Sequence, residues 1–242
     1  MKSWKFWIIG LLVFCSGCDS PEQEVTVFSI SFPFTELDPD EGPDEGWKGD
    51  FADYPEADSV TYGLYFHHDL LPDNLNSNGE TYGLHISGNN GSDDLFMFIK
   101  KKISGLRPNA TYELLFNIKL ASNAPTGAVG VGGAPGESVY LKAGASIIEP
   151  RKELQAGMYR MNIDKGNQAE EGSDMINLGH IGVGSGTTAF TVITRSNNSS
   201  NSFVVTTDDA GELWLVIGTD SGFEGTTTLY YTQVDVLFNK LD

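Results

Sequence analysis

The chain has 242 residues, with 33 acidic and 15 basic side chains, and its formal net charge is −18. Proteins that bind nucleic acids need clustered Lys and Arg to displace counterions, so an acidic chain without such a cluster argues against nucleic-acid binding. The same charge disfavours docking of the folded domain on anionic lipid head groups. A chain of this length can bury enough surface to fold as one generous β domain without cross-links.

The first seventeen residues have the pattern of a secretory signal. Lys2 and Lys5 precede an apolar run over residues 6–14, and Cys15-Ser16-Gly17-Cys18 follows. The run is shorter than the about 20 residues that a membrane-spanning helix needs. A basic start, a short apolar stretch and small residues before a cleavage site are typical of a signal that is removed. We therefore expect residues 1–17 to be a signal peptide.

The sequence around Cys18 resembles the lipobox of bacterial lipoproteins, although Cys15 stands where Leu is usual. The resemblance implies that Cys18 is the acylated first residue of the mature protein and that the lipid bilayer is its partner. Loss of Lys2 and Lys5 would change the net charge from −18 to −20. Residues 18–24 would form a tether of at most about 20 Å. The expected location is the bacterial cell envelope, at the outer membrane rather than the inner one. An ordinary signal peptide cut elsewhere is the alternative.

No disulfide is expected in the mature domain. The chain has only two cysteines. Cys15 would leave with the signal and Cys18 would carry the lipid. A secreted domain without disulfides depends on its hydrophobic core for stability.

Segments of alternating polarity recur between clusters of Gly, Asn, Asp, Ser and Thr, which is the pattern of short β-strands joined by turns. The alternation is clearest over residues 26–34 and 111–120. Residues 94–99 and 212–217 are apolar on both faces, which predicts central strands covered on both sides. The other expected strands are residues 62–66, 82–86, 138–143, 159–164, 190–194, 203–207 and 229–238.

Helical periodicity is nearly absent, and only residues 151–158 favour one or two helical turns. Many short strands without alternating helices predict an all-β fold, an antiparallel β-sandwich (jelly roll) of about ten strands. We expect residues 25–242 to form this single domain, with long loops at 36–59 and 167–186. Irregular stretches of that length are usually functional or wrongly assigned.

The segment from Gly105 to Tyr112 predicts a tight corner before a strand, because Pro108 fixes its own backbone and Asn109 tolerates the left-handed region. It resembles the tyrosine corner of fibronectin type III domains and of jelly-roll carbohydrate-binding modules, with Tyr112 as the corner tyrosine. The opening strand, acidic loop and Trp47 are also similar to those modules. The resemblance implies a galactose-binding-like jelly roll in which the first and last strands pair. Residues 123–186 have no counterpart in it.

The chain lacks the common signatures of enzymes. It contains neither a His-Glu-x-x-His zinc helix nor a Gly-x-Ser-x-Gly nucleophile elbow. The glycine-rich run over residues 127–136 lacks the Lys of a phosphate loop. Glu170 and Glu171 are adjacent in a loop, which does not give the separation that glycosidases use. The four histidines His67, His68, His85 and His180 have no metal-ligand spacing, so surface or hydrogen-bonding roles are preferred over zinc or copper.

Calcium is a possible structural ion, although no cofactor is required. Asp38 and Asp40 follow the first expected strand, and Asp235 lies on the polar face of the last. Calcium binds several carboxylate and carbonyl oxygens, and a junction between these strands could supply them. A solvated acidic loop is the alternative.

Four aromatic residues are candidates for binding a ligand: Trp47, Phe51, Tyr54 and Tyr62. The first three lie within eight residues of an expected polar loop. Sugar rings stack on flat aromatic faces while amides and carboxylates bind the hydroxyl groups. For Trp47 alone, a role as a cap on the core is preferred.

The sequence favours a membrane-anchored, non-catalytic binding module of the cell envelope, with a polysaccharide or other glycan as its ligand. Two alternatives stay open. One is an envelope protein that binds another protein or a peptide. The other is a carboxylate-dependent hydrolase that uses Glu170 or Asp174 in the second long loop.

Overall fold

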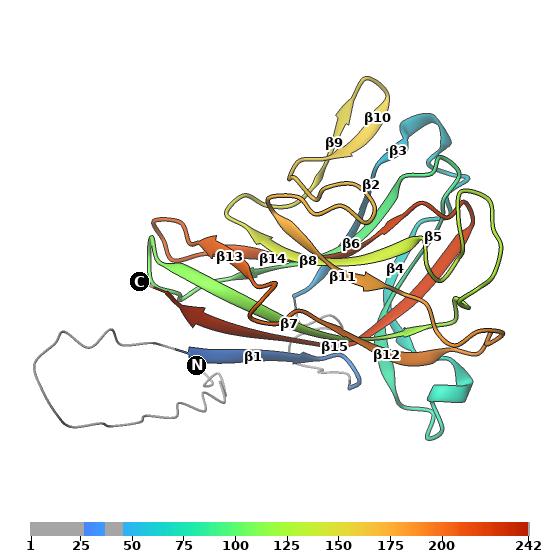
Figure 1. Ribbon diagram of the computed structural model, residues 1–242, viewed down its shortest axis with the longest axis horizontal. Helices are drawn as coiled ribbons and strands as arrows, with labels where there is room; N and C mark the ends of the chain where they lie inside the picture. The colour runs from blue at the N-terminus through green and yellow to red at the C-terminus, as the bar shows by residue number, and fades with distance from the viewer. Residues whose placement is uncertain (1–26, 37–45, 242) are drawn as a thin grey trace, which may run out of the picture.

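The computed structural model describes residues 27–36 and 46–241, and these form fifteen strands in three antiparallel sheets (Figure 1). The prediction of an all-β antiparallel sandwich is confirmed. The predicted signal peptide, Cys18 and the tether lie outside the described residues. A seven-stranded sheet and a five-stranded sheet form the two layers, and a small three-stranded sheet extends beyond the five-stranded one (Figure 1).

The seven-stranded sheet has the order β12-β7-β15-β5-β4, with β1 also paired to β15 and β13 also paired to β7. Its strands are β1 (Val27–Pro33), β4 (Tyr65–Leu70), β5 (Tyr82–Asn89), β7 (Thr111–Ser122), β12 (Thr191–Ser196), β13 (Phe203–Thr206) and β15 (Thr226–Lys240). The five-stranded sheet has the order β11-β8-β14-β6-β2. Its strands are β2 (Lys48–Ala52), β6 (Leu95–Ile103), β8 (Val139–Ser146), β11 (Met175–His180) and β14 (Leu213–Ser221).

The three-stranded sheet has the order β3-β10-β9. It consists of β3 (Tyr54–Pro55), β9 (Lys152–Gln155) and β10 (Met158–Met161). Two short 3-10 turns, η1 (Glu56–Asp58) and η2 (Asp73–Leu75), lie in the connections on either side of β4.

The main core lies between the two large sheets. In β7 every second residue from Tyr112 to Leu120 is buried, as the alternating pattern predicts. The inward side chains of β7 and β15 belong to the same buried cluster as those of β8 and β14. Alternation places successive side chains on opposite faces, so one face of each strand joins the core. The first and last strands pair along the whole of β1, from Val27 opposite Asn239 to Pro33 opposite Gln233, as expected.

The five-stranded sheet is covered on both faces. Leu95 to Lys100 in β6 are all buried, which confirms the prediction for this segment. A second buried cluster lies on the outer face of the sheet and includes Phe96, Phe98 and Val216 together with Ile163 and Met175. The cover consists of the β9–β10 hairpin and the segment over residues 162–174. The central strands are therefore apolar on both sides because a third layer covers the sandwich here.

The predicted tyrosine corner is present. Asn109 has a φ of 53°, in the left-handed region that Asn tolerates. The hydroxyl oxygen of Tyr112 accepts a hydrogen bond from the backbone N–H of Arg107 at 3.2 Å. Tyr112 is itself buried, so this bond fixes the turn to the core at the start of β7.

Tyr112→Phe should lower the free energy of unfolding by about 0.5 to 1.5 kcal/mol, because the ring is kept while one hydrogen bond to the corner is lost. Urea unfolding of both proteins measures this difference. Tyr140→Phe removes a hydroxyl from a partly exposed strand position and should change stability by less than about 0.5 kcal/mol. Equal losses from the two variants would contradict a stabilising role for the corner bond.

Several predicted boundaries were wrong. The expected loop over residues 36–59 contains β2 and β3, and the expected loop over residues 167–186 contains β11. The expected helical turns at 151–158 are the β9–β10 hairpin. Ala156 and Gly157 both have positive φ, 50° and 82°, and a two-residue hairpin turn requires such values at both positions.

Candidate functional site

The four aromatic residues proposed from the sequence lie in the core. Trp47, Phe51, Tyr54 and Tyr62 are 0%, 8%, 2% and 2% exposed. The ring of Trp47 packs edge-on against Phe32 at 5.4 Å. The preferred reading of Trp47 as a core residue is therefore confirmed. The other three rings are buried as well and offer no face to a ligand: Phe51 lies on a strand of the sandwich, and the rings of Tyr54 and Tyr62 pack against each other at 5.4 Å.

The proposed calcium ligands do not come together in the described part of the chain. Asp38 and Asp40 lie outside it. Asp235 accepts hydrogen bonds from Ser31, Asn117 and Gln233 on neighbouring strand positions. Within residues 27–36 and 46–241, no group of three or more His, Cys, Asp or Glu side chains could hold a metal ion. The environment of Asp235 is thus a side-chain network.

A different set of rings forms a continuous surface on the outer face of the seven-stranded sheet. We call it the aromatic strip and define it as His67, Tyr65, His85, Tyr230 and Phe190, in spatial order. Tyr65 is 40% exposed, and none of the five residues belongs to the buried core. Neighbouring ring centroids are 5.3, 4.8, 4.3 and 5.4 Å apart along the strip.

Strand register explains how the aromatic strip forms. His85 of β5 lies between His67 of β4 and Tyr230 of β15. In such cross-strand neighbours the side chains project from the same face of the sheet. The rings of His85 and Tyr230 are stacked, with an angle of 19° between their planes. Phe190 precedes β12, and its ring meets Tyr230 edge-on.

A row of polar side chains continues from the aromatic strip along β15 and its neighbours. Lys119 donates to Gln233 at 2.9 Å, and Gln233 donates to Asp235 at 2.8 Å. The register of β15 with β7 shifts between Tyr231 and Gln233, so one extra residue is inserted there. A one-residue insertion reverses which face the following side chains occupy. Gln233 and Asp235 therefore lie on the same outer face as Tyr230.

Asp69 holds two neighbouring rings of the aromatic strip in place. Its Oδ2 accepts hydrogen bonds from the hydroxyl of Tyr65 at 2.8 Å and from Nδ1 of His85 at 2.9 Å. Partial burial alone would raise the pKa of Asp69, but these hydrogen bonds hold it below its ordinary value. The hydrogen bond to Asp69 also raises the pKa of Tyr65. The carboxylate therefore fixes two rings on adjacent strands at the same time.

The sequence pattern contained part of this site. Tyr65, His85 and Tyr230 all lie in segments expected to be strands, on the side opposite the core residues. What the pattern could not show is the order β15-β5-β4, which places these positions side by side. Of the four histidines, His67 and His85 belong to the aromatic strip.

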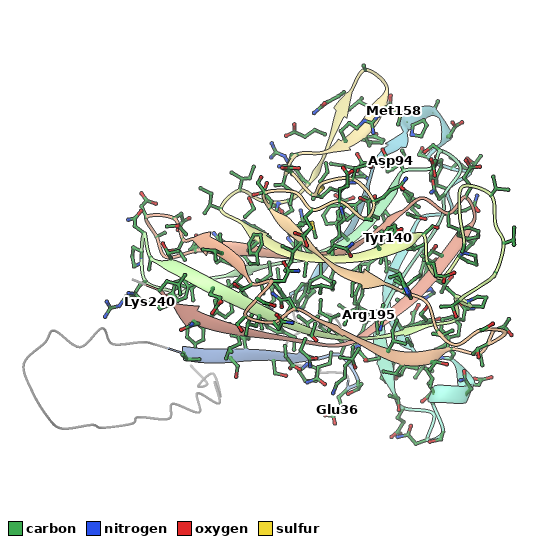
Figure 2. All side chains as sticks on the ribbon, viewed as in Figure 1. Glu36, Asp94, Tyr140, Met158, Arg195 and Lys240 are labelled. Atoms are coloured by element: carbon green, nitrogen blue, oxygen red, sulfur yellow. The ribbon has the colours of Figure 1, made fainter. Side chains whose placement is uncertain are left out.

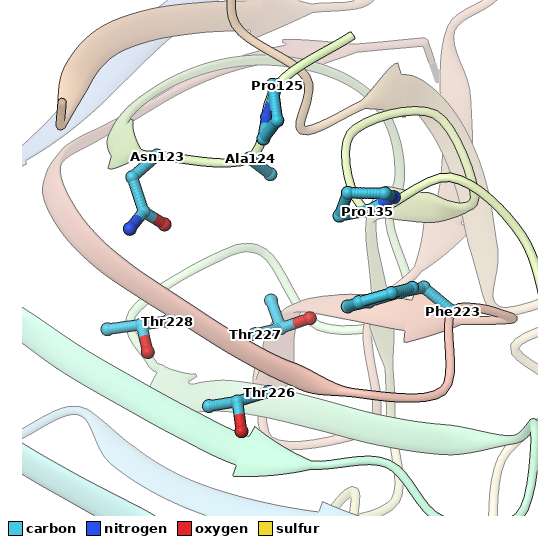
Figure 3. A pocket seen from close by; sticks show the side chains of 8 residues that line it. All are labelled: Asn123, Ala124, Pro125, Pro135, Phe223, Thr226, Thr227 and Thr228. Atoms are coloured by element: carbon cyan, nitrogen blue, oxygen red, sulfur yellow. The ribbon is translucent and has the colours of Figure 1, made fainter. Parts of the chain in front are cut away.

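The structure also contains a small pocket at one end of the sandwich, between β15 and the residues that follow β7 (Figure 3). Its volume is about 180 Å³, and its lining includes Asn123, Pro135, Phe223 and Thr227. Three successive threonines at the start of β15, Thr226, Thr227 and Thr228, also line it (Figure 3). None of the five residues of the aromatic strip lines this pocket.

Charged side chains are buried beneath the segment that covers the five-stranded sheet. Lys142 and Asp220 are 0% exposed, and Lys165 and Asp53 are 6% and 5% exposed. Asp220 lies 2.6 Å from the ammonium of Lys165 and 3.3 Å from that of Lys142. Lys142 also donates to the backbone oxygens of Lys165 and Glu170, both at 2.7 Å. These contacts fix residues 162–174 to the sheet. They also explain why β8 carries a buried lysine.

The carboxyl group of Asp94 borders this charged cluster and pairs with Arg160 at 2.9 Å. Burial raises its pKa to about 6, although the charge of Lys165 partly opposes the shift. A carboxyl whose pKa is higher in the folded state binds more protons when folded, so stability falls as pH rises between about 4 and 6.

Asp94→Asn removes this titration. We expect the stability of the variant relative to the wild type to increase by about 1 to 2 kcal/mol from pH 4 to pH 7, allowing for the 30% exposure of the Asp94 side chain. Urea unfolding of both proteins at several pH values measures the change. A stability difference that is the same at pH 4 and pH 7 would contradict the raised pKa.

The sandwich is closed along one side by Arg195 of β12. Its guanidinium, labelled in Figure 2, donates to the backbone oxygens of His180, the last residue of β11 in the other sheet, and of Gly182 just after that strand. His180 accepts a hydrogen bond from the N–H of Gly182 through Nδ1. Glu170 contributes its backbone oxygen to Lys142, and Asp174 accepts the N–H of Asp164. These contacts of His180, Glu170 and Asp174 are structural.

No protein-family model matches the chain, and no curated protein matches it. Among solved structures, a putative sugar-binding protein from Bacteroides thetaiotaomicron shares 12% identity over 79% of this chain and 88% of that one, with a TM-score of 0.38. A CBM22 xylan-binding domain from Paenibacillus barcinonensis shares 9% identity over 88% and 95%, with a TM-score of 0.37. The tailspike protein 4 domain of bacteriophage CBA120 shares 8% identity, with a TM-score of 0.32, and this chain spans 19% of its length. Because the sequence identities and TM-scores of these matches are low, the fold assignment depends on the strand pairing of this chain itself. In the part of the chain that the structure describes, no helix has the length and apolar character needed to cross a membrane.

Proposed function

We propose that the protein is a non-catalytic glycan-binding module of the bacterial cell envelope, and that the aromatic strip is its binding surface. The observation that carries this proposal is the unbroken series of five rings on one sheet face. The faces of aromatic rings are apolar and carry partial negative charge. They suit the C–H faces of sugar rings, which are apolar and weakly positive.

The polar row next to the aromatic strip suits the hydroxyl groups of a sugar. Hydroxyl groups both donate and accept hydrogen bonds. The row offers the carboxylate of Asp235, the amides of Asn117 and Gln233, and the ammonium of Lys119. These groups already bond to one another, so their positions are fixed before a ligand arrives. Such preorganisation lowers the entropic cost of binding.

An array of plant, algal and bacterial polysaccharides tests the proposal. Saturable binding to at least one polysaccharide is expected, without any shortening of the chain by the protein. Binding that stays at background across the whole array would remove the glycan proposal and favour a protein or peptide partner. Release of reducing ends would contradict the non-catalytic part and favour a hydrolase.

We also propose that Cys18 carries the lipid that holds the module at the membrane, by preference the outer membrane. Several acyl chains on one residue anchor durably, because each buried methylene contributes about 0.8 kcal/mol. Cys18→Ser should therefore shift the protein from the membrane fraction to the soluble fraction of fractionated cells. Asp19→Ser, next to the modified residue, serves as the control and should leave the protein in the membrane fraction. Retention of the Cys18→Ser protein would contradict the lipid anchor.

A further inference from the structure

The buried cluster under residues 162–174 has the composition of a reaction centre and not only of an ion pair. The ammonium of Lys165 lies 2.6 Å from Oδ2 of Asp220 and 3.3 Å from Oδ2 of Asp53. The side chains of Lys165, Asp220 and Asp53 are 7%, 0% and 7% exposed. The ring of Phe96 lies 5.1 Å from the same nitrogen. An amine, a carboxyl and a second carboxyl are thus held together where water has little access.

The two oxygens of Asp220 differ sharply in their surroundings. Oδ2 accepts from the backbone N–H of Gln168 at 2.8 Å and faces both Lys142 and Lys165. Oδ1 is buried and has no hydrogen-bond partner among the described residues, whereas Oδ2 of Asp53 faces the ammonium of Lys165. Buried polar atoms are nearly always paired in folded proteins, so the unpaired Oδ1 of Asp220 requires an explanation.

We propose that the side chains of Lys165 and Asp220 condense to an amide, which covalently joins the segment 162–174 to β14. The new bond forms between Nζ of Lys165 and Cγ of Asp220, and the bond from Cγ to Oδ1 breaks. The two protons lost from the ammonium leave with Oδ1 as one water molecule. No oxidant or reductant takes part, because the reaction is a condensation.

The neighbouring groups have positions suited to each part of this step. Burial disfavours the charged ammonium of Lys165, but the charges of Asp220 and Asp53 hold its pKa above the ordinary value, so a neighbouring base has to take a proton to leave a nucleophilic amine. Oδ2 of Asp53 lies 3.3 Å from Nζ, close enough to accept a proton from it. Lys142 and the N–H of Gln168 face Oδ2, where negative charge develops during attack on Cγ.

The product also accounts for the unpaired oxygen of Asp220. Oδ1 of Asp220 would be gone, and the new amide N–H would lie next to Oδ2 of Asp53. Oδ2 of Asp220 would become the amide oxygen and keep its contacts with Gln168 and Lys142. Lys142 is the less suitable nucleophile, because its ammonium already donates to two backbone oxygens in addition to facing Asp220. The amide would supply the cross-link that the two cysteines near the start of the chain cannot provide to this domain.

Peptide mapping of the full-length protein by mass spectrometry tests the proposal. In the wild type, trypsin should not cleave after Lys165. The peptide with Lys165 should be recovered joined to the peptide with Asp220, at a combined mass one water below that of the two free peptides, with fragment spectra that locate the link. Lys165→Arg and Asp53→Asn should each give the unlinked peptides, and recovery of the free Asp220 peptide should rise at least tenfold.

Lys100 and Glu149 provide an internal control, because they are paired at 2.9 Å while the Glu149 side chain is 43% exposed. They should remain unlinked in every sample. Complete recovery of free wild-type peptides, including one that ends at Lys165, would overturn the proposal. The wild-type measurement decides the matter even if a variant fails to fold, and it does not depend on whether the protein binds glycans.

Discussion

Tyr230→Ala should weaken the binding of a polysaccharide that the wild type binds by roughly ten- to a hundredfold. A tenfold loss corresponds to about 1.4 kcal/mol, and removal of a central aromatic contact commonly costs this much or more. Tyr230 connects Phe190 to the rest of the aromatic strip, because it stacks on His85 and also meets Phe190. Its loss would divide the aromatic strip into two parts. Isothermal titration or affinity electrophoresis with the selected polysaccharide measures the effect.

Tyr140→Ala is the matched control for this experiment. Tyr140 is a half-buried tyrosine on β8, on the outer face of the five-stranded sheet. Its removal should leave the affinity unchanged within about twofold, whereas melting curves confirm that both variants are folded. Equal affinities for the Tyr230→Ala protein and the wild type would exclude the aromatic strip as the binding surface. A large loss in the Tyr140→Ala protein would move the site to the other face of the sandwich.

The fold could be predicted well where one face of a strand is polar and the other apolar. β1 and β7 satisfy this condition, and their inward residues are those that the alternation predicts. The prediction failed where polar residues interrupt the alternation. In β2, Lys48 and Asp50 separate the inward positions, so a strand looked like a polar loop with exposed rings. One inward position of β2 is Gly49, which packs directly against the ring of Phe66. A glycine gives no apolar signal in the sequence, so this position could not be recognised as inward.

The functional surface was harder to predict than the fold. The aromatic strip takes residues from β4, β5, β15 and the segment before β12, so its existence depends on strand order. Period-two patterns give the face of each residue within its own strand but not the neighbour of that strand. The inserted residue in β15, between Tyr231 and Gln233, is equally invisible in the sequence. Without it, the polar row would not share a face with the rings.

Buried charges were missed for a related reason. Lys142 and Asp220 have residue types that usually lie at the surface. Their partners, Asp53 and Lys165, are distant in the sequence and come from other layers of the molecule. A polar residue inside an apolar strand was the available signal, and Lys142 in β8 and Asp220 in β14 both meet that description.

Asp220→Ala should lower the free energy of unfolding by about 3 to 5 kcal/mol, because removal of one partner leaves buried charges uncompensated. Asp220 is the carboxylate that faces both Lys142 and Lys165. Without it both lysines would remain buried, and Asp53 would still lie 3.3 Å from Lys165. Folded domains are typically stable by only about 5 to 15 kcal/mol, so the variant should unfold at a much lower urea concentration.

Asp209→Ala gives the comparison, because it removes an aspartate from an exposed position in the turn before β14 and should change stability by less than about 0.5 kcal/mol. Fluorescence-monitored urea unfolding of the three proteins separates loss of a buried partner from loss of one negative charge on an acidic protein. Similar midpoints for the two variants would mean that the buried lysines find other partners. In that case the cover would not depend on Asp220 for its position on the sheet.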